Sequence, residues 1–154
     1  MIQYVNQYKK TGVNNASKEQ ILLMLYDGAI KFLHKAKLAF ETKDIEQIHI
    51  NLTKAERIIT EFQSTLDMEN GGRFAEELYA LYEYLNNRLF LANIKKRTDY
   101  VDEVLKHLTE LRDTWREAIM KFKAEGHSLA ELENSGADGP PEEEIPRLED
   151  DFEI

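Results

Sequence analysis

Residues 17–42 read SKEQILLMLYDGAIKFLHKAKLAFET, and this stretch decides the fold class. Ser17 stands three residues before Gln20, which is the spacing of a capping box at the start of a helix. Apolar residues then recur every three or four positions, as they do on one face of a helix. We therefore predict a helix from Ser17 to about Thr42. Its core face comprises Leu22, Leu25, Tyr26, Ala29, Phe32, Leu33, Ala36 and Phe40.

Two more helices follow with the same period. Asp44 is a cap for the second, whose apolar stripe starts at Ile45 and which we expect to end near Asp67. The pair Gly71-Gly72 then supplies a turn. The third helix is predicted over residues 73–94, with a core face that includes Leu78, Leu85 and Leu89.

The fourth helix is predicted to start at a Thr98 cap and to run to about Phe122. Short connections place successive helices side by side, so the sequence predicts an all-α fold, an antiparallel up-and-down four-helix bundle. Three parts are expected along the chain: a flexible N-terminal arm (residues 1–16), the helical bundle (17–126) and an acidic, disordered tail (127–154). The tail contains all three prolines and few bulky residues, so it cannot bury enough surface to order itself.

The charge is distributed unevenly. Of the formal net charge of −9, residues 133–154 contribute nine acidic side chains against the single base Arg147. The rest of the chain is nearly neutral and lacks the basic field with which proteins bind nucleic acid. We therefore expect no nucleic-acid partner. The chain also has no cysteine, no apolar run of spanning length and no signal-peptide core, so we expect a cytoplasmic protein without membrane insertion.

Catalytic and metal-binding patterns are weak. Glu46 and His49 have the Glu-x-x-His spacing of di-metal bundles, but those centres need the motif twice and two further glutamates. A solvated helix face is the favoured interpretation.

Gly71-Gly72 before Arg73 has an anion-binding interpretation, but a plain turn between helices is favoured. No nucleophile, phosphate or dinucleotide motif is present. We expect no catalytic residue, no metal, no cofactor, no small-molecule substrate and no enzyme activity.

Apolar side chains remain after the bundle is packed. The first helix is apolar almost all round, and the third has aromatic residues on both flanks of its core face. Wide stripes can simply contact two neighbouring helices, which accounts for most of these residues. The alternative is an exposed groove for a partner segment. The candidate partner-binding residues in the helices are Leu23, Met24, Ile30, Tyr79, Tyr84, Phe90 and Leu91.

Taken together, these segments resemble the FliS family of flagellin-specific export chaperones of the flagellar type III secretion system. The resemblance runs from about Val5 to Phe122, with its motifs in the family's order. They are YKKTGVNNAS (8–17), LLMLYDGAI (22–30), NLTKA (51–55), Gly71-Gly72, LYEY (81–84) and LRD (111–113) with Trp115.

The resemblance implies a cytoplasmic helical bundle without catalysis that binds the C-terminal segment of flagellin. It implies that the bundle prevents premature polymerisation and delivers flagellin to the export apparatus, docking at the cytoplasmic part of the export gate. It also implies that apolar arm residues, here Val5 and Tyr8, cover part of the binding surface and take part in docking. The alternative for Tyr8 is a solvent-exposed tyrosine.

Two points stay open. The tail departs from the family pattern, and its apolar residues Ile145, Leu148, Phe152 and Ile154 form either a short linear motif or part of a solvated extension. The alternative to a flagellin chaperone is a helical scaffold or regulatory protein that binds another secretion substrate.

Overall fold

The structure is a computed structural model, and it describes residues 17–125. These residues form four helices and no strand: α2 (Lys18–Glu41), α3 (Ile45–Ser64), α4 (Gly72–Lys95) and α5 (Thr98–Ala124). The predicted all-α fold is therefore confirmed. The arm at residues 1–16 and the tail at 127–154 lie outside the described residues, as do Val5 and Tyr8.

The first two helices begin as their sequences predict. The Ser17 side chain accepts a hydrogen bond from the Gln20 backbone N–H at 3.2 Å, and the Gln20 side chain accepts one from the Ser17 N–H at 2.9 Å. At the start of α3, the Asp44 side chain accepts from the Gln47 backbone N–H at 3.1 Å. Each cap satisfies donors that have no partner within the helix.

The predicted end of α3 was wrong. The helix ends at Ser64, three residues earlier than predicted. Asp67 belongs to the turn that follows the helix and stabilises that turn. Its Oδ1 atom accepts hydrogen bonds from the backbone N–H groups of Glu69 and Asn70, at 3.2 and 3.0 Å. An aspartate that bonds to the backbone ahead of it favours a turn over a helix.

The predicted Thr98 cap was also wrong. Arg97 occupies the cap position with extended backbone and no capping side chain, and Thr98 is the first helical residue. Asp99 in the first turn instead accepts two hydrogen bonds from the Arg97 guanidinium. A carboxylate in the first turn is favoured by the helix dipole. Asp99 therefore stabilises the start of α5, although no side chain caps it.

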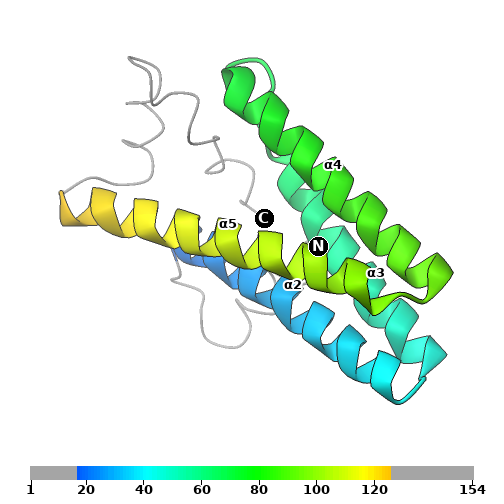
Figure 1. Cartoon of the computed structure of the whole chain (residues 1–154). Coiled ribbons are helices and arrows are strands. Elements are labelled where there is room, and N and C mark those ends of the chain that lie inside the picture. The colour runs from blue at the N-terminus through cyan, green and yellow to red at the C-terminus, as the bar shows by residue number, and fades with distance from the viewer. Residues whose placement is uncertain (1–16, 126–154) are drawn as a thin grey trace.

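The four helices form a closed ring of neighbours. α2 packs against α3 and α5, and α4 packs against the same two helices. The connections at 42–44, 65–71 and 96–97 are short, so consecutive helices are antiparallel. In Figure 1 the connections at 42–44 and 96–97 lie at the same end of the bundle.

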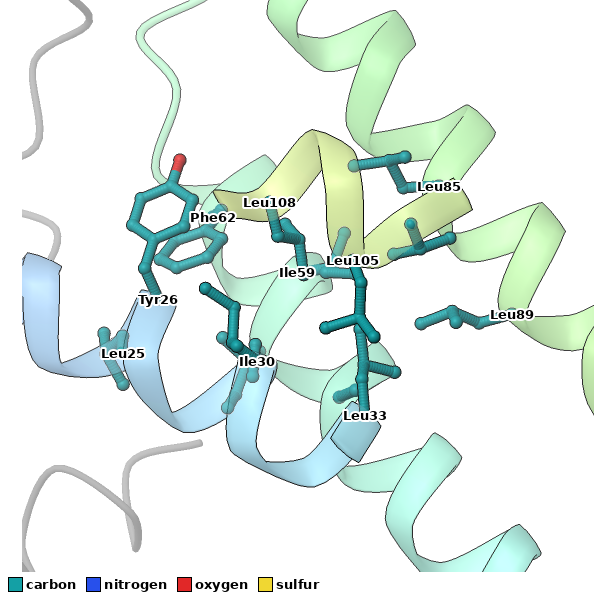
Figure 2. Close-up of a cluster of buried hydrophobic side chains, with 14 of the residues drawn as sticks. Leu25, Tyr26, Ile30, Leu33, Ile59, Phe62, Leu85, Leu89, Leu105 and Leu108 are labelled. Carbon is teal, nitrogen blue, oxygen red and sulfur yellow. The ribbon is translucent and has the colours of Figure 1, made fainter. Parts of the chain in front are cut away.

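Buried side chains from all four helices fill the space between them (Figure 2). The largest fully buried ones include Tyr26, Phe62 and Leu108. Two residues of the predicted face of α2, Phe32 and Phe40, are only half-buried and pack against the edge of this core. Ile45 is 57% exposed, although it was expected to start the apolar stripe of α3, because the first residue of the helix lies at the end of the bundle.

Candidate functional site

α4 exposes large apolar side chains on two different sides. Phe90 and Ile94 are 55% and 65% exposed, and Tyr79 and Tyr84 are also exposed. Tyr79 and Phe90 stand seven residues before and four after Asn86, which bonds to Thr60, so they lie on the side of α4 that faces α3. Tyr84 bonds to Glu103 and lies on the side that faces α5. The predicted residues of α4 therefore do not converge on one pocket but border two seams of the bundle.

The seam between α3 and α4 is polar at its surface. Gln63 donates to Glu83 at 2.9 Å, Asn86 donates to Thr60 at 2.9 Å, and the Asn93 amide lies 2.9 Å from His49 Nδ1. These bonds hold the two helices together while leaving apolar neighbours uncovered.

Three exposed apolar residues stand within about one helical turn of the two residues that form the last of these bonds. Ile45 precedes His49 by one turn of α3, Phe90 precedes Asn93 by about one turn of α4, and Ile94 follows Asn93 directly. We call Ile45, Phe90 and Ile94 the α3–α4 patch. Exposed apolar groups gathered in this way are typical of a surface that a partner covers.

The seam between α4 and α5 holds Tyr84 in a charged cluster. Its hydroxyl donates to Glu103, which also accepts from Arg88 at 2.8 Å. The Arg88 guanidinium in turn lies 4.0 Å from the centre of the Tyr100 ring. The hydrogen bond to Glu103 raises the pKa of Tyr84, and the bonds from Tyr84 and Arg88 lower the pKa of Glu103. The Tyr84 hydroxyl is thereby fixed, the Arg88 guanidinium lies 5.6 Å from the centre of its ring, and 43% of the residue stays exposed.

The other candidate residues differ in exposure. Leu23 and Met24 on α2 and Leu91 on α4 are half-buried, so each offers part of its surface to a partner. Ile30 is only 8% exposed and belongs to the core between the helices (Figure 2). Its side chain therefore has almost no surface for a partner.

Sequence reasoning did not select Ile45 and Ile94. Ile94 stands four residues after Phe90, which places both on one side of α4, so the helical spacing contained the signal. Ile45 starts an apolar stripe, and this spacing predicts a core residue. Periodicity along one helix does not show that Ile45 lies at the end of the bundle, where it is exposed.

Glu46 and His49 are both exposed on α3, and His49 is engaged by Asn93. No group of three or more His, Asp or Glu side chains is arranged for a metal ion within residues 17–125. In the same residues, no helix combines the length and the apolar character that crossing a bilayer requires.

Comparison with known proteins identifies the family. The model of the family described as "Flagellar protein FliS" matches residues 1–122. The flagellar secretion chaperone FliS of Bacillus subtilis is 37% identical over 120 residues, covering 78% of this chain and 89% of that protein. The FliS chaperone of Salmonella typhimurium is 33% identical over 119 residues, covering 77% and 88%. This helical bundle therefore belongs to the FliS family of flagellar secretion chaperones.

Proposed function

We propose that this flagellar export chaperone binds the C-terminal segment of flagellin in the cytoplasm. In this function it prevents premature polymerisation and delivers flagellin to the cytoplasmic part of the export gate. Membership in a family of secretion chaperones rather than of enzymes supports the proposal. Val5 and Tyr8 of the arm are the residues proposed to cover part of the surface and to take part in gate docking.

The exposed apolar side chains on both sides of α4 are the observation that carries the proposal. The α3–α4 patch and Tyr84 border different seams, so a compact partner with one flat face would cover only one of them. A segment that is unfolded before binding can wrap around a bundle and bury apolar residues at separate places. An amphipathic helix laid along a seam buries its residues at three- and four-residue spacings, which fits Phe90 and Ile94.

Calorimetric titration with a synthetic flagellin C-terminal peptide tests the proposal. We expect Phe90→Ser with Ile94→Ser to weaken binding at least about tenfold, because each substitution removes a large apolar contact. Leu38→Ser is the matched control: Leu38 is as exposed as these residues but lies on the outer side of α2. Its affinity should match that of the unmodified protein.

Two results would contradict the proposal. One is unmodified affinity in the doubly substituted variant, which would remove the α3–α4 patch from the binding surface. The other is no binding of the peptide by the unmodified protein. In that case, binding of another exported protein would favour the scaffold or regulatory alternative.

A further inference from the structure

Four basic side chains of α2 and α3 have no acidic partner among residues 17–125. Lys31 and Lys35 on α2 and Lys54 and Arg57 on α3 are exposed, and none forms an ion pair with another described residue. Several bases elsewhere on the bundle are paired with carboxylates. Examples are Lys37 with Asp102, Arg88 with Glu103 and Arg112 with Asp27. Among residues 17–125, no carboxylate lies within ion-pair distance of these four charges.

Two of these four charges lie beside one aromatic ring. The ammonium groups of Lys35 and Lys54 lie 5.9 and 5.3 Å from the centre of the Phe32 ring, from two different helices. We call Lys31, Phe32, Lys35, Lys54 and Arg57 the α2–α3 cationic face. Both ammonium groups carry the same charge beside one apolar ring, so an acidic segment with apolar residues has complementary chemistry to this face.

The chain itself contains a segment with the complementary chemistry. Residues 142–154 read EEEIPRLEDDFEI and have seven acidic side chains against the single base Arg147. Ile145, Leu148 and Phe152 stand among these acids at spacings of three and four residues. On the cationic face, Phe32 is half-buried, and so is Ile50, one turn before Lys54. The FliS family model ends at residue 122, so this acidic segment lies beyond the part shared with the family.

The segment can reach the face. α5 ends at Ala124, and a flexible linker of the length between Ala124 and Glu142 would have an end-to-end distance of about 22 Å. The start of α2 lies at the same end of the bundle as the end of α5, because these neighbouring helices are antiparallel. From there, Phe32 is about 21 Å along the helix. A tether of this length gives an effective concentration in the millimolar range, far above that of any second copy at micromolar protein.

We propose that residues 142–154 dock on the α2–α3 cationic face of the same molecule. The contact is held by charge and by a few apolar side chains, so salt weakens it. Any other acidic partner of the α2–α3 cationic face must therefore compete with residues 142–154. The proposal does not depend on flagellin binding, since the face lies away from the α3–α4 patch.

Carbodiimide cross-linking of the full chain tests this docking, because it joins a lysine amine to a carboxylate only when the two are in contact. At low salt we expect monomeric products that link Lys31, Lys35 or Lys54 to acidic residues of 142–154. Lys106 on α5 is the matched control, since it is exposed, has no ion pair with another described residue and lies about 27 Å from the end of α5.

Arg57→Glu reverses one charge without removing a reactive amine. We expect it to abolish the links at the three lysines, as does 1 M salt, where screening acts within about 3 Å. A tail variant with Glu149→Gln, Asp150→Asn and Asp151→Asn should reduce the links without touching the bundle. Links to Lys106 as frequent as those to the three lysines would overturn the proposal, and so would links found only in dimers or no links at all.

Discussion

The hydroxyl groups of Tyr26 on α2 and Tyr82 on α4 lie 2.6 Å apart in the buried centre of the bundle and share a hydrogen bond. The Phe62 ring of α3 stacks on Tyr26, with ring centres 4.3 Å apart. The pair connects two helices that are diagonal to each other in the ring of four. Burial raises the pKa of both tyrosines, so both hydroxyls stay protonated and able to pair at neutral pH.

The losses of stability on removing the two hydroxyls should not be additive, because each hydroxyl is the other's partner. Tyr82→Phe leaves the Tyr26 hydroxyl buried without its partner on α4, which costs about 1–3 kcal/mol in the free energy of unfolding. The double variant Tyr26→Phe with Tyr82→Phe leaves neither hydroxyl, although the Trp115 side chain loses its bond to Tyr26, and it should lose less than the sum of the single variants. Urea unfolding of the four proteins measures the coupling. Strictly additive losses would show that the bond contributes nothing.

Gly71→Ala should destabilise the turn before α4. A Cβ atom at residue 71 would overlap the Asp67 carbonyl oxygen and the Ala75 side chain, and both belong to a tightly hydrogen-bonded turn. We expect a loss of about 1–3 kcal/mol, as for other overpacked sites. Thermal unfolding of this variant beside Ala80→Gly, an exposed change within α4, separates the clash from ordinary helix propensity. A loss no larger than that of Ala80→Gly, about 1 kcal/mol, would contradict the expectation.

The Tyr84, Arg88 and Glu103 cluster predicts an acid-sensitive seam between α4 and α5. The pKa of Glu103 is lowered in the folded state, so its stabilising effect is complete above the ordinary carboxyl range. That effect is lost as the pH falls through the lowered pKa, because the unfolded chain binds the proton more readily. Glu103→Gln should therefore reduce stability at pH 7 and make little difference near pH 2.

Urea midpoints at the two pH values check this sign. Glu110→Gln is the matched control, because Glu110 is exposed on the same helix and has no ion pair within residues 17–125. Equal effects of Glu103→Gln at pH 7 and pH 2 would count against the cluster as the cause.

Flagellin binding, if it proceeds as proposed, should fold the bound segment. Burial of apolar surface on both sides of α4 gives a large negative heat-capacity change, and ordering of the peptide adds helix beyond the sum of the free components. Calorimetry over a range of temperatures and circular dichroism of the mixture measure both. A heat-capacity change near zero together with additive spectra would mean that the peptide does not fold on this surface.

The sequence by itself determined the helices. The caps at Ser17 and Asp44 and the three- and four-residue apolar spacing act within a single turn, so a local reading recovers them. The end of α3 also depends on a local interaction, since Asp67 bonds to the backbone two and three residues ahead. The prediction placed the end too late because the apolar spacing of α3 continues to Leu66.

Only the tertiary structure decided which apolar flank is covered. Ile30 and Met24 are both beyond the central face of α2, yet Ile30 is in the core and Met24 is half-buried, because coverage depends on where the neighbouring helices lie. The pairing of Tyr26 with Tyr82, 56 residues apart, and the gathering of Lys35 and Lys54 around Phe32 arise in the same way. Periodicity specifies a direction around one helix axis, whereas contacts between helices depend on the rotation and register of both.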